Sequence, residues 1–217
     1  MRLSIMLAAA VGLLTAALPL FAGEPAGLPP APGTYRLDRI QRVPQAIVLE
    51  GSLIPRLLSH YIGGKITLFG FFYSYCADPE GCPLAWDAFE KVRAEIMADA
   101  KLHGRIRLVF MSLDPAHDSP DAMKGFAQRY EAGGRAVPWH FLTTYSGFFL
   151  KPLLRGMGEE VSARPGEDGV VLNHMLKVFL IDKEGWVREI YSSQTLDPVL
   201  VLGDIRTLLL EETALSP

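Results

Sequence analysis

The sequence has few of the features that mark several large classes of protein. Its 217 residues carry a formal net charge of only −3, which excludes the strongly basic surface typical of nucleic-acid-binding proteins. The single asparagine, Asn173, is followed by His174 and Met175, so no N-glycosylation site is present. No internal repeat divides the chain, and its length predicts one domain with a substantial core.

Only one segment is apolar enough to matter for a membrane, and it lies at the N-terminus. Arg2 precedes an apolar run from Leu3 to Leu18, and Ala22-Gly23 offers a small-residue cleavage site. Residues 1–22 are therefore expected to be a signal peptide. Because the run is nearly long enough to span a bilayer, an uncleaved N-terminal anchor is the alternative. Either one exports the rest of the chain.

The remaining residues divide into a short lead-in and one domain. Residues 23–45 include the segment EPAGLPPAPG, which is rich in proline and glycine and predicts an extended tether. Residues 46–217 alternate between buried apolar runs and helical patterns. Strands are expected at Lys65–Tyr75, Arg105–Leu113 and Trp139–Leu142, and a hairpin at Leu176–Ile181 and Val187–Tyr191. Helices are expected at Pro83–Lys101, Asp118–Tyr130, Tyr145–Gly156 and Leu196–Leu210. This order predicts an α/β, thioredoxin-like fold with a central mixed sheet flanked by helices.

The two cysteines, Cys76 and Cys82, lie where the first core strand is expected to turn into a helix. Five residues separate them, which is neither the C-x-x-C spacing of redox enzymes nor a common zinc-finger step. The start of a helix stabilises a thiolate, so we expect a lowered pKa at Cys82. Asp78 and Glu80 in the loop disfavour a second anion and favour a bound cation. The loop therefore suits a metal better than a highly reactive thiolate.

Among the five histidines, His174 is the favoured third ligand. His60 and His103 lie near the ends of expected segments, His117 lies in a polar turn, and His140 belongs to an expected strand. His174 precedes a hairpin strand, and in a thioredoxin-like sheet that loop lies beside the cysteine centre. Two thiolates and an imidazole suit copper, because Cu(I) accepts two or three such ligands and Cu(II) can add an oxygen. A structural zinc site would need a fourth protein ligand.

Several motifs follow one another in a recognisable order. They are LFGFFYSYC, the pair Cys82-Pro83, MSLDPAHDSPDAMKGFAQRY, WHFLT, and His174 ahead of VFLIDKEG. In this order the chain resembles the Sco/SenC/PrrC family, the thioredoxin-like copper proteins of cytochrome c oxidase assembly. The resemblance extends from about Gly64 to Leu210.

The resemblance implies that copper, as Cu(I), Cu(II) or both, is bound by Cys76, Cys82 and His174. The usual family motif is C-P-x-x-C-P, with three residues between the cysteines. Here five residues, ADPEG, separate them, and Ala77 replaces the first proline. Asn173 stands where the family usually has aspartate. The longer loop changes how the two sulfurs approach one ion, so we expect an altered copper geometry or affinity.

The resemblance implies a copper metallochaperone in the periplasm, or anchored in the inner membrane and facing the periplasm. Its client would be the copper-bearing subunit of cytochrome c oxidase or another exported cuproprotein. It would deliver copper to the dinuclear copper site or reduce the cysteines of that site. The alternative is an enzyme, a periplasmic thiol-disulfide oxidoreductase with Cys76 and Cys82 as its redox-active pair, but we favour a metallochaperone. A third hypothesis is a structural disulfide, which a domain of this length does not need.

Overall fold

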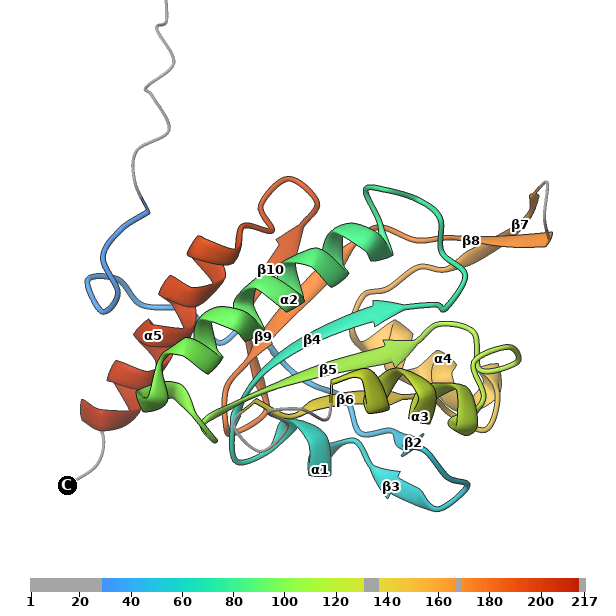
Figure 1. Cartoon of the computed structure of the whole chain (residues 1–217), viewed down its shortest axis with the longest axis horizontal. Helices are drawn as coiled ribbons and strands as arrows, with labels where there is room; N and C mark the ends of the chain where they lie inside the picture. The colour runs from blue at the N-terminus through green and yellow to red at the C-terminus, as the bar shows by residue number, and fades with distance from the viewer. Residues whose placement is uncertain (1–28, 131–136, 167–168, 215–217) are drawn as a thin grey trace, which may run out of the picture.

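A six-stranded mixed sheet forms the centre of the fold (Figure 1). The computed structural model describes residues 29–130, 137–166 and 169–214. From edge to edge, the sheet contains β1 Gln41–Arg42, β10 Trp186–Ser192, β9 Lys177–Ile181, β4 Ile66–Phe72, β5 Ile106–Ser112 and β6 Trp139–Leu142. The strands β4, β5 and β6 run parallel, whereas β9 pairs antiparallel with both β4 and β10. The predicted mixed sheet is therefore confirmed.

The strands β4 and β5 form the most deeply buried part of the sheet. All seven residues of each strand are buried, which is why both appear in the sequence as continuous apolar runs without alternation. Phe72 at the end of β4 pairs with Ser112 at the end of β5. The carboxyl ends of these two strands therefore meet at one edge of the sheet, and the segments that follow them start side by side.

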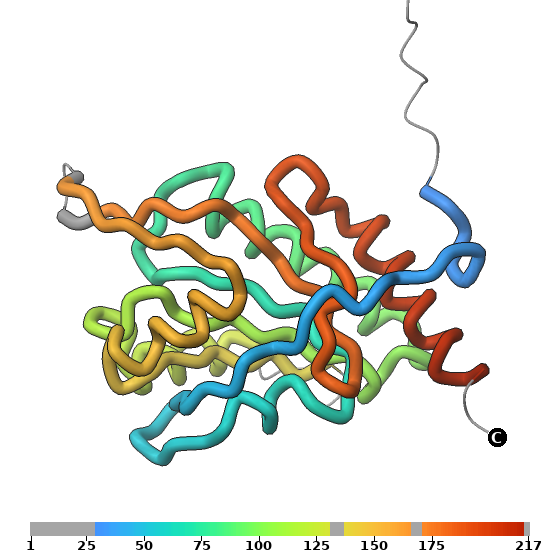
Figure 2. Tube along the Cα trace, turned by 180° about the vertical axis from the view of Figure 1, so that it is seen from behind, coloured from blue at the N-terminus to red at the C-terminus, as the bar shows by residue number. Residues whose placement is uncertain are grey.

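Helices cover both faces of the sheet. They are α1 Ser59–Ile62, α2 Cys82–Ala98, α3 Pro120–Arg129, α4 Gly147–Gly156 and α5 Pro198–Ala214, with one 3-10 turn, η1 Ala100–Leu102. The helices α2, α3 and α5 lie on the face seen in Figure 1, and α4 lies on the opposite face, seen from behind in Figure 2. In α2, Phe89, Val92 and Ile96 are buried, so their helical spacing places one apolar stripe against the sheet.

The core elements expected from the sequence are confirmed, with differences of a few residues at their ends. The strand expected at Lys65–Tyr75 already ends at Phe72, because the chain leaves the sheet there and Ser74 and Tyr75 are exposed. The helix expected from Pro83 begins one residue earlier, at the second cysteine. The first cysteine consequently lies in the middle of a loop.

Several further elements escaped the sequence patterns. They are the short helix α1, the strand β1, the hairpin of β2 Ile47–Leu49 and β3 Pro55–Leu57, and the hairpin of β7 Ser162–Gly166 and β8 Gly169–Asn173. All three residues of β3 are exposed, and β7 has the sequence SARPG. Neither strand shows the alternation of apolar and polar residues that marks a half-buried strand. The second hairpin matters for the site, because β8 leads directly to His174.

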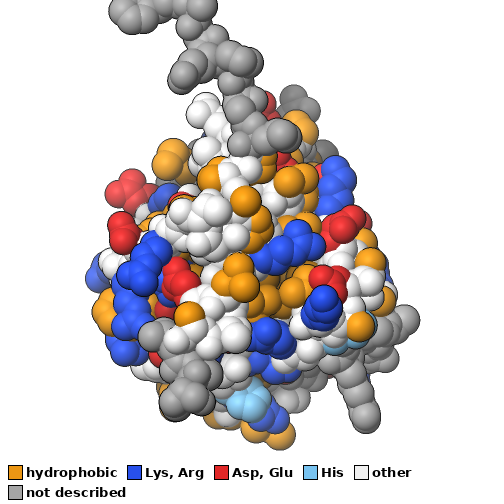
Figure 3. Space-filling model, turned by 90° about the vertical axis from the view of Figure 1, so that its left-hand side faces the viewer, with side chains coloured by type: hydrophobic (Ala, Val, Ile, Leu, Met, Phe, Trp, Pro, Cys, Tyr) orange, Lys and Arg blue, Asp and Glu red, His pale blue; other side chains and the backbone are white. Residues whose placement is uncertain are grey.

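The described chain begins along α5 and β10. The Tyr35 hydroxyl donates to Asp204 Oδ1 at 2.6 Å, and β1 pairs with β10. The leader expected at residues 1–22 lies outside the described residues, and within those residues no helix is long and apolar enough to cross a membrane. Figure 3 views the molecule from the side where α5 lies in Figure 1, and acidic and basic side chains are interspersed there among hydrophobic ones.

Candidate thiol and metal site

The loop that follows β4 is fixed to the end of β5 by a buried carboxylate. Asp118 is fully buried, and its Oδ2 accepts hydrogen bonds from the Ser74 backbone N–H at 3.2 Å and the Ser112 hydroxyl at 2.6 Å. The loop then turns, since the Cys76 N–H donates to the Tyr73 carbonyl at 3.2 Å. Asp118 therefore positions the backbone two residues before Cys76.

A second carboxylate supports the same loop from the same side. Asp114 Oδ2 accepts a hydrogen bond from the Tyr75 hydroxyl and is also hydrogen-bonded to His117 Nδ1. These contacts lower the pKa of Asp114 against the opposing effect of burial, which is the largest single influence on that group. The segment DPAHDSP thus holds the cysteine loop, a role that the sequence analysis missed. The sequence contained an indication of this role, because Asp114 and Asp118 both follow a buried strand that runs parallel to β4.

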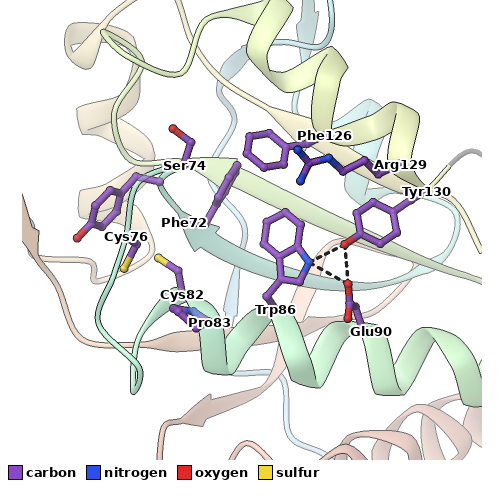
Figure 4. Close-up of a pocket in the computed structure, with 11 residues that line it drawn as sticks. Phe72, Ser74, Cys76, Cys82, Pro83, Trp86, Glu90, Phe126, Arg129 and Tyr130 are labelled. Atoms are coloured by element: carbon purple, nitrogen blue, oxygen red, sulfur yellow. Dashed lines mark hydrogen bonds between the residues drawn. The ribbon is translucent and has the colours of Figure 1, made fainter.

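The two cysteine side chains point toward each other in Figure 4. Both are free thiols; Cys76 is half-buried and Cys82 is 5% exposed. The helix α2 begins after Gly81 without a side-chain cap, so its first N–H groups need other acceptors. The backbone N–H groups of Cys82 and Asp78 lie near the Cys76 sulfur and help to lower the pKa of Cys76. The Cys76 sulfur therefore lies at the N-terminus of the helix that carries Cys82.

This arrangement gives the two thiols opposite acidities. The Cys82 thiol donates to the Cys76 sulfur, and this bond, helped by Tyr73 and the backbone N–H groups, lowers the pKa of Cys76 to about 5 despite its burial. The same hydrogen bond, together with burial and the neighbouring negative charge, raises the pKa of Cys82. The expectation of a lowered pKa at Cys82 was wrong, because the hydrogen bond to Cys76, burial and the neighbouring negative charge outweigh the lowering effect of the nearby backbone N–H groups.

Tyr73 joins the cysteines to the histidine loop. Its side chain is 4% exposed, and its pKa is raised by burial and then by the neighbouring Cys76. The hydroxyl lies 3.3 Å from the Leu172 carbonyl in β8 and also faces Cys76. Since a thiolate is the stronger acceptor, the single hydroxyl proton turns to the sulfur when Cys76 is ionised. The sequence analysis did not identify Tyr73, which reads there as one more aromatic residue of a buried strand.

His174 lies between β8 and β9, beside Tyr73, with 6.3 Å between the two ring centres. The side chain is half-buried, and burial lowers its pKa although Cys76 and Asp78 act in the opposite direction. Its Nδ1 lies 3.3 Å from the Met175 carbonyl. A neutral imidazole that donates from Nδ1 keeps Nε2 as a free lone pair, which is the form a metal needs.

The structure gathers the three predicted ligands at one end of the sheet. Across residues 29–130, 137–166 and 169–214, however, no three His, Cys, Asp or Glu side chains converge closely enough to hold an ion. Asp78 and Glu80 are exposed, and Asp78 Oδ1 instead accepts from the Glu80 N–H at 3.1 Å. Metal binding by all three predicted residues therefore requires His174 and the two sulfurs to come closer together.

The other histidines are accounted for by ordinary contacts. His60 and His103 are exposed, as the sequence predicts. His140 lies in β6, also as predicted, and its Nδ1 is 2.7 Å from Glu50 Oε1. The imidazole of His140 is therefore hydrogen-bonded to Glu50 and is not part of the cysteine site.

A pocket of about 400 Å³ opens beside the thiols. Cys76 and Cys82 form one end of it, and aromatic side chains form much of the remaining wall, together with Ser74, Pro83, Glu90 and Arg129 (Figure 4). The aromatic residues include Phe72 from the end of β4, Trp86 from α2, and Phe126 and Tyr130 from α3 and its C-terminal cap. A ligand that reached the sulfurs from this side would contact an aromatic wall.

Comparison with known proteins gives both a family and solved relatives. A family model described as SCO1/SenC matches residues 57–210. The mitochondrial protein SCO2 of Saccharomyces cerevisiae is 27% identical over 128 residues, which cover 56% of this chain and 38% of the yeast protein. The chain thus matches well under two thirds of that relative's length.

Among the solved structures that match most of the chain are two Sco proteins. Arabidopsis thaliana ScoI with copper bound has a TM-score of 0.65 at 16% identity, covering 79% of this chain and 99% of that one. BsSco, described as a Sco-family cytochrome c oxidase assembly protein with a disulfide switch, has a TM-score of 0.59 at 21% identity, covering 80% and 98%. These likenesses bear on the fold alone, and they confirm the predicted thioredoxin-like arrangement.

Proposed function

Because the chain belongs to the SCO1/SenC family, we propose that it is an exported copper-binding metallochaperone. The observation that carries this proposal is the pair of facing thiols, one of them with a pKa lowered to about 5, next to a histidine loop. A protein that must accept and release copper needs soft ligands that are ionised at neutral pH and remain partly accessible. The copper-bound Arabidopsis relative supports the proposal.

Cys76, Cys82 and His174 would hold the ion. Cys76 already offers a thiolate, and Cys82 would lose its proton when copper binds, so loading releases a proton. His174 would contribute Nε2, with Nδ1 held by the Met175 carbonyl. Copper supplies Lewis acidity and, between its two valences, the transfer of one electron.

The client we propose is the copper-bearing subunit of cytochrome c oxidase. Another exported cuproprotein is the alternative client. The protein would deliver copper to the dinuclear site of that subunit or reduce its cysteines. The oxidase-assembly role described for BsSco supports this client. The leader of residues 1–22 would place the domain in the periplasm, either free or anchored to the inner membrane.

Copper titration tests the proposal. The reduced domain and the variants Cys76→Ser, Cys82→Ser and His174→Ala are titrated with Cu(I) and Cu(II) against a competing chelator, with His103→Ala as a matched surface control. Each cysteine variant should lose about 100-fold or more in affinity, and His174→Ala about tenfold. The proposal fails if the native domain binds copper no more tightly than the double cysteine variant.

A second function is favoured by the opposite acidities of the two thiols. An ionised, half-buried Cys76 backed by a protonated, buried Cys82 is the arrangement of an attacking and a resolving thiol in a thiol-disulfide oxidoreductase. The Cys76 thiolate would attack a client disulfide and form a mixed disulfide, and the departing client sulfur would take up a proton. Cys82 would then lose its proton, attack the Cys76 sulfur and release the second client thiol. Two electrons pass to the client, and a Cys76–Cys82 disulfide remains.

Reduction of a disulfide-linked client peptide distinguishes this enzyme from the metallochaperone. Turnover that persists in His174→Ala and in the presence of a copper chelator would support the oxidoreductase. Turnover that falls in His174→Ala as copper affinity falls would exclude it in favour of the metallochaperone.

A further inference from the structure

The aromatic pocket beside the cysteines has a built polar rim. Trp86 Nε1 donates to the Tyr130 hydroxyl oxygen at 2.6 Å, and the Tyr130 hydroxyl donates to Glu90 Oε1 at 2.6 Å. Trp86 Nε1 also lies 3.2 Å from the same Glu90 oxygen. These bonds lock the Trp86 indole with its apolar part toward the pocket, as Figure 4 shows. The wall therefore exists before any ligand arrives.

Arg129 is the positively charged side chain among the residues that line the pocket. Its guanidinium lies over the Phe126 ring, 5.4 Å from the ring centre, and the arginine is exposed. Within the part of the chain that the structure describes, Arg129 forms no ion pair, and Glu90 on α2 accepts from Trp86 and Tyr130 through Oε1. A ligand whose acidic side chain reaches the α3 side of the pocket can therefore pair with the Arg129 guanidinium.

The order of these features along the pocket matches an extended peptide. Trp86 follows Cys82 by one helical turn, about 5–6 Å between Cβ atoms. Alternate side chains of an extended chain lie roughly 6–7 Å apart on the same side. In Figure 4, Arg129 lies beyond Trp86 from the sulfurs. A strand crossing the pocket would therefore present a residue to the thiols, the next alternate one to the aromatic wall, and the one after that to the arginine.

We propose that this pocket binds a segment of the client protein with the pattern Cys-x-Φ-x-acid, where Φ is an apolar or aromatic residue. The client cysteine would meet Cys76, Φ would pack against Trp86 and Phe126, and the acidic side chain would pair with Arg129. The inference rests on the proposed function, because it names the chemistry of the client that receives copper or electrons at the same site.

Peptide binding to the full domain tests this assignment without any exchange of disulfides. The probe is acetyl-Ala-Gly-Phe-Ser-Glu-amide, in which alanine replaces the client cysteine, and its partners carry Ser for Phe, or Gln or Lys for Glu. Binding is measured by calorimetry and by the change in the tryptophan fluorescence of the domain. Replacing Phe by Ser should weaken binding about tenfold or more, and replacing Glu by Gln should weaken it about fivefold.

The matched pair Arg129→Gln and Lys124→Gln shows whether the charge acts locally. Both residues are exposed cations of α3, so each variant loses one charge from the same helix. Arg129→Gln should reduce affinity for the Glu peptide about fivefold, leave the Gln peptide unchanged and keep full copper binding. Lys124→Gln should change neither.

Two results would overturn the assignment. The first is equal affinity for the Glu, Gln and Lys peptides, or equal losses in the Arg129→Gln and Lys124→Gln variants. The second is binding of the tripeptide glutathione in the pocket without binding of the probe, which would assign the pocket to a small thiol. Copper titration of the same samples separates these outcomes from a failure of the proposed function, since that failure removes copper binding from the native domain.

Discussion

Arg188 and Cys76 are two charged groups held inside the same sheet-based fold, and their surroundings differ. Arg188 on β10 is 9% exposed and donates to Asp182 Oδ2 at 3.2 Å and to Glu211 Oε2 at 2.7 Å. Its remaining N–H groups reach the Leu37 carbonyl. Cys76 is only half-buried, and its partners are a thiol, a hydroxyl and two backbone N–H groups.

The partners of Arg188 and those of Cys76 differ in chemical type and in which atoms they leave available to a ligand. The Arg188 cluster pairs a cation with two carboxylates, and within the described residues Glu211 Oε1 is the one oxygen of these carboxylates that is buried without a partner. Such a network of opposite charges can contribute to stability, and it contains no soft ligand for a metal. Around Cys76 every partner is a donor, so the sulfur is stabilised as an anion while one side stays open to the pocket. One region of the molecule therefore stabilises the fold, and the other keeps a reactive group available.

The largest expected effect comes from removing the cation of the Arg188 cluster. Arg188→Met should lower the free energy of unfolding by about 3–5 kcal/mol, because Asp182 and Glu211 lose their cation while still buried or half-buried. Urea unfolding measures this loss, with the exposed Arg56→Met as the control, which should change stability by less than about 0.5 kcal/mol. A loss of stability in Arg188→Met no greater than in the control would contradict the claim that the Arg188 cluster stabilises the fold.

Glu159 provides an intermediate case, a buried charge with few partners. Burial raises the pKa of Glu159 to about 7, although Lys177 lies 3.8 Å away. Its folded pKa lies above the usual 4.5, so its contribution to stability is present below about pH 4.5 and is lost as the pH rises through 7.

Replacing this carboxyl should remove that pH dependence. Between about pH 5 and pH 8, the native domain should lose about 2–3 kcal/mol of stability relative to Glu159→Gln. Urea unfolding across this range measures the difference, and Glu160→Gln, at the exposed neighbouring position, is the control. A constant difference between the native domain and Glu159→Gln would show that burial does not perturb this group.

A smaller change is expected when Cys76 loses its main donor. Cys82→Ala removes the hydrogen bond that contributes most to the lowered pKa of Cys76, so that pKa should rise from about 5 by about one to two units. The pH dependence of iodoacetamide alkylation, followed by mass spectrometry, gives the midpoint. Cys82→Ser keeps a donor and should show a smaller rise. A midpoint that stays near 5 in Cys82→Ala would contradict the assignment of donor and acceptor.

The smallest change should follow removal of the Tyr73 hydroxyl. Tyr73→Phe deletes a weaker donor to the same sulfur, so the pKa of Cys76 should rise by less than about one unit. The same alkylation profile measures it, and Tyr75→Phe is the matched control, because the Tyr75 hydroxyl donates to Asp114 and to no thiol. An equal rise in both variants would mean that Tyr73 acts only through packing.

Much of the fold could be predicted because its central strands carry strong patterns. The runs that became β4 and β5 are buried along their whole length, and such runs stand out in any sequence. The exposed strand β3 and the hairpin of β7 and β8 carry no such pattern. Their strands are defined by pairing between neighbouring segments, which sequence periodicity does not reveal.

The site was predictable in its residue types but not in its acidities. The position of Cys76 and Cys82 at a strand-to-helix transition, with His174 before a hairpin strand, follows from the order of elements. Which thiol donates to the other, and which is more deeply buried, depend on how the five-residue loop folds, and these two features make Cys76 the stronger acid. The support from Tyr73 and Asp118 likewise depends on contacts between segments distant in the sequence.

X-ray absorption at the copper edge tests the central claim most directly. The Cu(I)-loaded native domain is compared with His174→Ala and with the double variant of Cys76 and Cys82. Our account predicts two sulfur neighbours and one nitrogen neighbour around copper in the native domain, loss of the nitrogen in His174→Ala, and loss of both sulfurs in the double variant. A native spectrum without sulfur neighbours, or one unchanged by the double substitution, would contradict it.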